Sequence, residues 1–320
     1  MPSEMDRETL RMKVVLLGAS GQLGQELARQ LDSQDHLSVL SPSDLDITDH
    51  QAVAHTLVKL EPDVIINAAA FTAVDKAERE KNIAYAINSD AVANIAQLAN
   101  DMNAWLIHYS TDYVFDGTKP SPYLERDETN PINTYGASKL AGDKHIQAHT
   151  RNYLIFRTTW IIGSDGNNFA KTILRLASER EQLSVVNDQR GVPTSPSLIA
   201  HVTIDALKAI DNKTAWPAGI YNLTPQGSTT WHEIAQVLIH KANQYGLDLA
   251  TNPENVHAVT TDEYPTVARR PLNSQLNTDK LEEYLSLAKY SIAASLTFRE
   301  FILISSSESF KTLLKECTTL

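Results

Sequence analysis

Residues 13–24 read Lys13-Val-Val-Leu-Leu17-Gly18-Ala-Ser-Gly21-Gln-Leu-Gly24, and this stretch decides the fold. Its first five residues form an apolar run typical of a strand that is buried on both faces. Three glycines follow in the spacing G-x-x-G-x-x-G, and the next residues up to Leu31 have a helical pattern. This order predicts a dinucleotide site, because glycine lets the backbone approach a pyrophosphate that rests on the N–H groups of the helix N-terminus. The alternative is that the glycines only permit a tight corner.

A second motif, Tyr135-Gly-Ala-Ser-Lys139, predicts acid–base chemistry. A tyrosine and a lysine four residues apart on a helix share one face, so the ammonium can lie beside the phenol. Pro131 and Asn133-Thr134 predict a turn and a helix cap, which would place Tyr135 in the first helical turn. The nearby cation and the positive end of the helix dipole would both lower the pKa of the phenol. An ordinary helix pair has the same spacing.

Composition and charge indicate a globular protein and argue against a nucleic-acid binder. With 320 residues, 42% of them hydrophobic and 21% charged, the chain can form one large domain or two unequal ones. It has no apolar run long enough for a membrane span, residues 1–10 do not resemble a signal peptide, and Cys317 is its only cysteine, so a cytoplasmic enzyme is expected. The net charge of −11 argues against nucleic-acid binding. The ten histidines show no metal-ligand spacing, so no metal site is predicted.

The first half of the chain alternates short apolar runs with helical patterns. The expected strands are 13–17, 37–40, 63–67, 105–110 and 153–158, and the expected helices are 21–31, 49–60, 80–102 and 135–150. This order predicts an α/β fold with a Rossmann-like, doubly wound parallel sheet. Ligands bind such sheets at the carboxyl ends of the strands, where the glycine turn, Asn67-Ala-Ala-Ala70 and Ser110-Thr111 should all lie.

Beyond residue 160 the pattern is looser. Helices are expected over 169–180, 197–210 and 231–245, strands over 183–187 and 219–223, and a proline-rich loop over 253–271 before a helical tail. We therefore expect a dinucleotide-binding domain formed by residues 12–165 together with about 195–225. A smaller α/β substrate-binding lobe would comprise about 166–194 and 226–300, with terminal extensions at 1–11 and 301–320.

Together these motifs resemble the extended short-chain dehydrogenase/reductase superfamily and, within it, the dTDP-4-dehydrorhamnose reductase family. The matching segments are 18–24, 66–78, 108–117, 135–142, 156–160, 187–189 with Pro193-Thr194, and 268–274. The resemblance implies NADPH-dependent reduction of the C4 keto group of dTDP-4-dehydro-6-deoxy-L-mannose, a dTDP-linked 4-keto-6-deoxyhexose, to dTDP-L-rhamnose. NADH is the alternative cofactor, and the chain could form a homodimer.

The resemblance also implies roles for individual residues. Tyr135 would donate the proton, Lys139 would lower the pKa of Tyr135 and hold the nicotinamide ribose, and Thr111 would orient the carbonyl. The implied cofactor-binding residues are Gly18, Ser20, Gly21, Gln22, Leu23, Gly24, Asp46, Ile47, Ala68, Ala69, Ala70, Tyr135 and Lys139. The implied substrate-binding residues are Val74, Asp75, Tyr113, Trp160 and Arg270.

Several residues also have a purely structural interpretation. Asp75 could cap the helix that it begins, Trp160 could belong to the core, and one of Arg269 and Arg270 could be a surface charge. His108 is expected to be a buried strand residue. Asn88 is expected to be a hydrogen-bonded helix residue and not a catalytic one. An anionic nucleotide needs a locally basic site, for which the candidates are Lys139, Arg157, Arg190, Arg269 and Arg270.

The chain departs from the family's pattern in three places. Ser197 stands where some bacterial members have a glutamate that helps to bind a metal, so that site is not predicted. The second strand ends at Leu40 without the acidic residue that binds an adenosine 2′-hydroxyl, and Ser41 and Ser43 could accept a 2′-phosphate, which favours NADPH. The tail after about residue 280, including Phe301–Ser307, does not match the family.

Other functions of the same fold stay open. Another nucleotide-sugar 4-ketoreductase, an epimerase or a dehydratase would resemble this chain, but the dehydratases have an Asp-Glu pair after the threonine, whereas Thr111 is followed by Asp112-Tyr113. A non-catalytic protein, such as the regulatory subunit of methionine adenosyltransferase, also shares the fold. Stoichiometric cofactor oxidation would indicate a reductase, and a stable complex with a larger enzyme would indicate the regulatory subunit.

Overall fold

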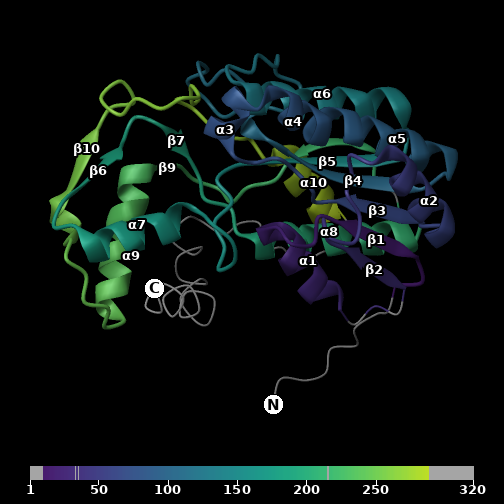
Figure 1. Ribbon diagram of the computed structural model, residues 1–320, viewed down its shortest axis with the longest axis horizontal. Coiled ribbons are helices and arrows are strands. Elements are labelled where there is room, and N and C mark those ends of the chain that lie inside the picture. The colour runs from purple at the N-terminus through teal and green to yellow at the C-terminus, as the bar shows by residue number, and fades with distance from the viewer. Residues whose placement is uncertain (1–9, 33, 35, 215, 288–320) are drawn as a thin grey trace.

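A six-stranded parallel sheet forms the centre of the computed structural model (Figure 1). The structure describes residues 10–32, 34, 36–214 and 216–287. In sheet order, the strands are β2 (Leu37–Leu40), β1 (Val14–Leu17), β3 (Val64–Asn67), β4 (Trp105–Thr111), β5 (Tyr153–Thr158) and β8 (Gly219–Asn222). All neighbouring pairs run parallel, which confirms the predicted doubly wound α/β fold.

The central strands are buried on both faces, which explains their continuous apolar runs. In β1, Val14 and Leu16 belong to one core, and Val15 and Leu17 belong to the core on the other face. The helices that close the first core are α1 (Gln22–Leu31), α8 (Pro196–Asp211) and α10 (Asp279–Leu287). Those that close the second are α2 (His50–Leu60), α5 (Ala91–Asp101) and α6 (Thr134–His149). In Figure 1, α5 and α6 lie above the sheet and α1 and α8 below it.

The strand order reverses between β1 and β3, which are neighbours in the sheet although β2 lies between them in the chain. Leu17 at the end of β1 pairs with Asn67 at the end of β3. The glycine turn and the segment after Asn67 therefore leave the sheet side by side. Such a reversal is where doubly wound sheets bind their ligands.

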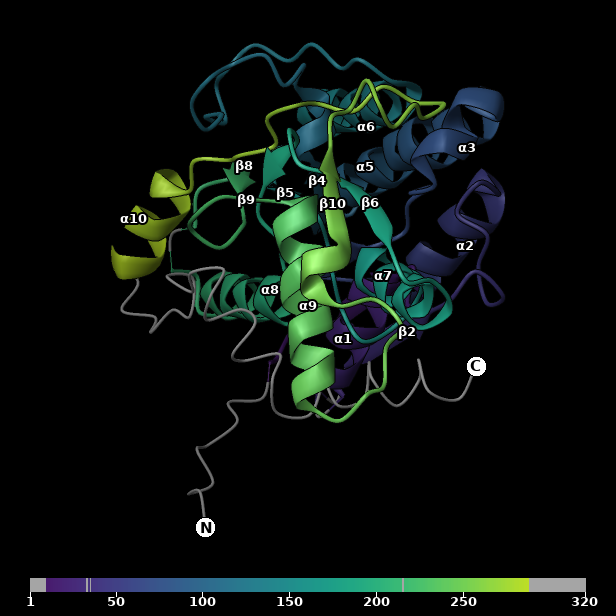
Figure 2. The same ribbon diagram turned by 90° about the vertical axis from the view of Figure 1, so that its left-hand side faces the viewer.

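A smaller α/β group lies at the left of Figure 1. Its elements are α7 (Phe169–Glu179), β6 (Leu183–Val186), β7 (Arg190–Gly191), β9 (Thr229–Thr230), α9 (Trp231–Gln244) and β10 (Val256–Val259). Strand β10 runs parallel to β6, and β7 runs antiparallel to β9. Residues of α7, α9, β6 and β10 share an apolar core, and Figure 2 shows α9 and β10 at the front of this group. The residue boundaries of the two expected domains stay a prediction.

Some elements differ from the prediction. The helix expected over 80–102 is divided into α4 (Lys81–Tyr85), a π-helical turn η1 (Ala86–Asp90) and α5. Helix α3 (Val74–Arg79) begins beside Asp75, where a helix was expected, whereas the strands β7, β9 and β10 were not expected, and β10 lies in the stretch that the prolines mark as loop. Residues 288–300 of the expected lobe, and the tail with Phe301–Ser307, lie outside the described residues. Within the described part of the chain, every helix is too short or too polar to cross a bilayer.

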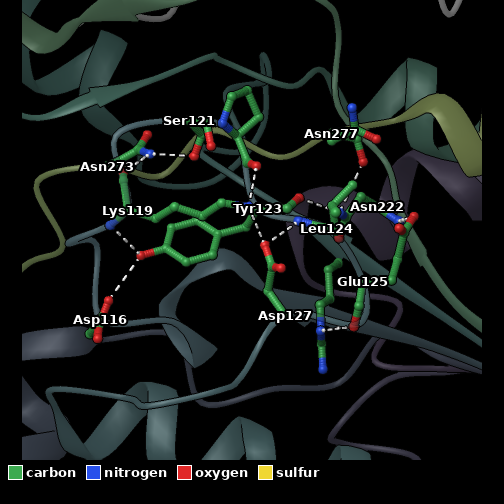
Figure 3. Close-up of polar contacts among 12 residues, drawn as sticks. Asp116, Lys119, Ser121, Tyr123, Leu124, Glu125, Asp127, Asn222, Asn273 and Asn277 are labelled. Carbon is green, nitrogen blue, oxygen red and sulfur yellow. Dashed lines mark hydrogen bonds and ion pairs between the residues drawn. The ribbon is translucent and has the colours of Figure 1, made fainter.

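The segment 116–127 joins strand β8 to the chain that returns from the smaller group (Figure 3). The backbone N–H of Tyr123 donates to the carbonyl of Gln275, and that of Asn277 donates to the carbonyl of Tyr123, both at 2.8 Å. Asn222, at the end of β8, donates through Nδ2 to the carbonyls of Tyr123 and Asn277, both at 2.9 Å. These bonds hold the residues that follow Arg270 against the edge of the sheet.

Candidate active site

The glycine turn after β1 packs tightly against the end of β3. Gly18 has a φ of +81°, and a Cβ on it would lie 2.3 Å from the backbone nitrogen of Ala69. A Cβ on Gly24 would lie 2.1 Å from the carbonyl oxygen of Gly18. Both positions therefore require glycine. Gly21 is the N-cap of α1, and no side chain of the described residues caps this helix, so its first N–H groups can bind a pyrophosphate.

A cavity of about 480 Å³ lies at the carboxyl edge of the sheet. The predicted cofactor-binding and catalytic residues that line it are Gly21, Gln22, Leu23, Ala68, Ala69, Ala70, Thr111, Tyr135 and Lys139. The predicted substrate-binding residues that line it are Val74, Tyr113, Trp160 and Arg270. The structure thus brings together side chains from the ends of β1, β3, β4 and β5 with Arg270 from far along the chain.

Six predicted site residues lie outside the lining of this cavity, namely Gly18, Ser20, Gly24, Asp46, Ile47 and Asp75. Gly18 and Gly24 shape the turn beneath it. Ile47 belongs to the core of the sheet, and the Asp46 carboxylate accepts hydrogen bonds from the backbone and hydroxyl of Thr48. Asp75 lines a neighbouring cavity together with Arg270.

The turn after β2 holds a carboxylate that the sequence does not predict there. Asp44 Oδ2 accepts hydrogen bonds from the backbone N–H of Ser41 at 2.9 Å and from its hydroxyl at 2.6 Å. The hydroxyls of Ser41 and Ser43 lie 2.7 Å apart. The hydrogen bonds from Ser41 lower the pKa of Asp44, so the turn presents two hydroxyls beside an ionised carboxylate.

Tyr135 lies in the first turn of α6, as predicted. The Asn133 side chain caps this helix by accepting from the N–H of Gly136 at 2.8 Å. Glu78 of α3 adds a contact that the sequence does not predict, because its carboxylate accepts from the N–H of Thr134 at 2.6 Å and from its hydroxyl at 3.0 Å. A carboxylate is favourable at a helix N-terminus, so α3 helps to place the turn that contains Tyr135.

The pKa of Tyr135 is shifted in the direction opposite to the prediction. Burial raises this pKa, and a hydrogen bond with Thr111 opposes the rise only in part. The net shift is therefore upward, because the loss of solvent around the phenol outweighs the interactions that favour the phenolate. The ring of Tyr113 packs edge-on against Tyr135, with 5.7 Å between the ring centroids.

Lys139 is almost completely buried, and its ammonium faces a histidine. Its Nζ lies 3.0 Å from Nε2 of His108, whose Nδ1 lies 3.3 Å from Nδ2 of Asn67. Burial lowers the pKa of Lys139 to about 8, and the charge of Asp143 opposes this shift. His108 is fully buried on β4, which confirms the expectation of a buried strand residue.

Two buried carboxylates belong to the surroundings of the site. Asp143 accepts from the Ser110 hydroxyl at 2.8 Å and pairs with the buried guanidinium of Arg157 at 3.4 Å. Arg157 thus contributes to a buried ion pair. Asp112 Oδ1 accepts from the Thr111 hydroxyl at 3.1 Å, and burial raises the pKa of Asp112 to about 7.

The structure shows the contacts of the predicted substrate-binding residues that also had a purely structural interpretation. Asp75 does not cap α3, whose N-cap is Ala73, and instead accepts from Arg270 Nη2 at 2.6 Å and from the N–H of Ala268 at 2.9 Å. Arg270 lines the cavity, whereas Arg269 is exposed. Trp160 also lines the cavity and is half-buried.

Several lining residues are absent from the predicted set, namely Asn67, Asp112, Asn168, Phe169 and Trp231. Trp231 was expected only as the start of a helix, and its place in the site depends on how the smaller group meets the sheet. Asn88 is buried, and its side chain bonds to both backbone groups of Phe71 and to the Ser138 hydroxyl, as expected of a structural residue. Among the described residues, no group of three or more His, Cys, Asp and Glu side chains could hold a metal ion.

The glycine turn at the reversal of a parallel sheet, with Thr111, Tyr135 and Lys139 around one cavity, defines the extended short-chain dehydrogenase/reductase class. The family described as the RmlD substrate binding domain matches residues 12–300. The dTDP-4-dehydrorhamnose reductases of Shigella flexneri and Escherichia coli strain K12 are 49% and 47% identical to the chain, each over 86% of it and 93% of the relative. The chain belongs to the dTDP-4-dehydrorhamnose reductase family.

Solved structures agree with this assignment. A dTDP-4-dehydrorhamnose reductase from Bacillus anthracis, in complex with NADP, superposes with a TM-score of 0.77 at 36% sequence identity. The superposition covers 88% of this chain and 94% of the other. The predicted family and fold are therefore both confirmed.

Proposed function

We propose that this protein reduces the C4 keto group of dTDP-4-dehydro-6-deoxy-L-mannose to dTDP-L-rhamnose with NADPH, or alternatively with NADH. The observation that supports this most is the convergence of Thr111, Tyr135 and Lys139 on one cavity beside the glycine turn. The similar proteins from Shigella flexneri and Escherichia coli have the name of this activity, and the Bacillus anthracis structure holds NADP.

The residues of the site are suited to proton donation. When bound, the nicotinamide cofactor supplies a hydride to the carbonyl carbon. Tyr135 donates its proton to the carbonyl oxygen, and burial keeps the phenol protonated until then. The Thr111 hydroxyl, hydrogen-bonded to Tyr135, orients that oxygen. The resulting phenolate is stabilised by the charge of Lys139, which also holds the nicotinamide ribose.

Residues at the rim and in the wall of the cavity supply the substrate contacts. A dTDP group brings negative charge to a protein whose net charge is −11, so its diphosphate needs a local cation. Arg270 provides one, and Asp75 holds its guanidinium at the rim of the cavity. Val74, Tyr113 and Trp160 form the wall for the sugar. We also expect the enzyme to work in the cytoplasm and to form a homodimer.

The test of this function compares the wild-type protein with Tyr135→Phe. The ketosugar is labile and should be generated in place by the preceding epimerase, while the absorbance of NADPH is followed. The wild-type protein should oxidise NADPH stoichiometrically. The variant should lose activity by roughly 100-fold or more, because it keeps the ring and lacks the proton donor, and it should bind NADPH as before.

Tyr85→Phe, on the exposed surface of α4, is the control and should keep full activity. Near-normal turnover by Tyr135→Phe would contradict the role of this residue. Failure of the wild-type protein to oxidise either cofactor would contradict the substrate or the reaction itself.

A further inference from the structure

Trp160 has an unusual backbone conformation at the edge of the active site. Its φ is +45°, and it has the largest side chain of the non-glycine residues with positive φ in the described part of the chain. This region is unfavourable for a bulky residue and persists only where the surroundings hold it. The backbone is held by Thr194, whose N–H donates to the Trp160 carbonyl and whose carbonyl accepts from Ile162, both at 3.1 Å.

The Trp160 indole is held by two contacts with the smaller group. It stacks on Trp231, with 3.8 Å between the ring centroids and 21° between the planes. It also packs against Gly191, where a Cβ would lie 2.7 Å from ring atoms Cε2 and Cζ2. No residue larger than glycine fits there unless the indole moves. We call Trp231 and Gly191 the indole clamp.

Both members of the indole clamp belong to one local structure. Gly191 in β7 pairs with Thr229 in β9, and Trp231 follows β9 directly as the first residue of α9. A capping box fixes this helix start, because the Thr230 hydroxyl accepts from the N–H of Glu233 and the Glu233 carboxylate accepts from the N–H of Thr230. The distance between the two clamp residues is therefore set by the strand pair and the cap.

Trp231 of the indole clamp also lies between two cavities. Trp160, Trp231 and Phe169 all line the cavity that contains Tyr135. Trp231 and Phe169 additionally line a second cavity, and Arg270 lines both. Trp160 follows the end of β5 in the central sheet, whereas Trp231 and Gly191, which contact its indole, belong to the smaller group. The orientation of the Trp160 indole therefore depends on the contact between the central sheet and the smaller group.

We propose that Trp231 and Gly191 are positioning residues for substrate binding, which hold the Trp160 indole in the orientation that forms the wall of the sugar-nucleotide site. The inference rests on the proposed function, because it takes Trp160 as a substrate contact. Loss of the Trp231 ring frees the indole and a side chain at position 191 displaces it, and neither change touches the glycine turn or the pair Tyr135 and Lys139. The defect should therefore appear in the use of the sugar nucleotide and not in the use of NADPH.

The test measures KM for the ketosugar, KM for NADPH and kcat in the full-length protein. Trp231→Leu and Gly191→Ala should each raise KM for the sugar nucleotide about tenfold, while KM for NADPH stays within about twofold. Trp231→Phe, which can still stack, should restore most of the loss. Gly191→Ala tests the inference without altering α9, so a folding defect of Trp231→Leu would not decide the result.

A double-mutant cycle separates positioning from direct contact. In a Trp160→Ala background, Trp231→Leu should raise KM for the sugar nucleotide no further, because the clamp has nothing left to hold. An equal rise in both backgrounds would overturn the proposal, as would an unchanged KM in Trp231→Leu and Gly191→Ala. The stacked indoles should also give an exciton signal in circular dichroism that Trp231→Leu removes. That signal still tests the clamp if the wild-type protein fails to reduce the ketosugar, which would refute the proposed function.

Discussion

Asp112, beside Thr111, is a carboxylate with almost no access to solvent. Only 3% of it is exposed, and the hydrogen bond from the Thr111 hydroxyl offsets its burial only in part, so its pKa rises to about 7. Burial without a cation makes the charged form unfavourable in the folded protein. The folded state therefore becomes less favourable as Asp112 ionises.

Asp112→Asn should stabilise the protein at about pH 8 and change its stability little at about pH 4. The folded pKa of about 7 lies above the ordinary pKa of 3.8, so the contribution of Asp112 to stability is fully present below about pH 4 and is lost as the pH rises through 7. Asparagine has nearly the same shape, and the nearby hydroxyls can accept from its amide. The expected gain at about pH 8 is on the order of a few kcal/mol, read from thermal melts across the pH range.

Asp116→Asn is the control, because it should change the stability in the opposite direction. Hydrogen bonds from Thr118, Tyr123 and Asn130 lower the pKa of Asp116 to about 2, so this carboxylate stabilises the fold at neutral pH. The melting temperature at about pH 7 should fall in Asp116→Asn and rise in Asp112→Asn. An equal effect of Asp112→Asn at low and high pH would show that its charge is not the cause.

Single residues also show what local sequence can and cannot predict. The spacing of Tyr135 and Lys139 predicts that they share a helix face, and Asn133 predicts the cap, because both are properties of one helix. The direction of the Tyr135 pKa shift depends instead on how much solvent the fold removes. The partner of Lys139 is His108, a strand residue 31 positions away, which no helical pattern reveals.

At the scale of elements, α6 is placed by close contact with the π-helical turn η1. A Cβ on Gly142 of α6 would lie 2.2 Å from the carbonyl oxygen of Asn88 in η1. The Asn88 side chain in turn bonds to the backbone of Phe71 and to Ser138 of α6. The π turn thus connects the segment after β3 with the helix that contains Tyr135.

Gly142→Ala should destabilise the protein, although alanine favours helices. The propensity gain is about 1 kcal/mol, whereas an overlap with a backbone oxygen costs about 1–3 kcal/mol or more because neither element can move freely. The net loss should appear as a lower midpoint in urea. Lys144→Ala, on the exposed face of α6, is the matched control and should change stability by less than about 0.5 kcal/mol. If Gly142→Ala were as stable as the wild type, η1 would have to move away from the added methyl group at little cost in free energy.

Elements with strong periodicity are the ones that the sequence predicts well. The buried strands and long helices of the first half have apolar patterns that belong to one element alone, and they lie where expected, except that η1 divides the helix expected over 80–102. Strands β7 and β9 have two residues each, which is too short for any pattern. Strand β10 exists because β6 pairs with it, and its residues His257 and Ala258 are exposed, so its sequence lacks the apolar run of a buried strand.

At the scale of the whole molecule, the position of Arg270 depends on how the chain returns to the sheet. Residues 273–277 follow it and are held by the segment 116–127 and by Asn222 of β8 (Figure 3). These three segments are far apart in the sequence. Charge alone makes Arg270 one of five basic candidates, and the family resemblance singles it out, because its place in the site is created by this long-range connection.

Asn222→Ala should therefore weaken the contact that joins β8, the segment 116–127 and residues 273–277. Asn222 is fully buried and donates two hydrogen bonds, so alanine would leave the carbonyls of Tyr123 and Asn277 without these donors. The expected loss is about 2–4 kcal/mol, measured by urea unfolding. KM for the sugar nucleotide should also rise, because Arg270 precedes the released segment.

Asn277→Ala is the matched control, because Asn277 lies in the same returning segment of the chain. Its side chain makes two exposed hydrogen bonds with Asp279, donating to the carboxylate and accepting from the backbone N–H, while its backbone carbonyl still accepts from Asn222 in the variant. Its stability should stay within about 0.5 kcal/mol of the wild type. If the two variants proved equally stable, the hydrogen bonds of Asn222 would not hold the returning chain, and the position of Arg270 would have to depend on its ion pair with Asp75.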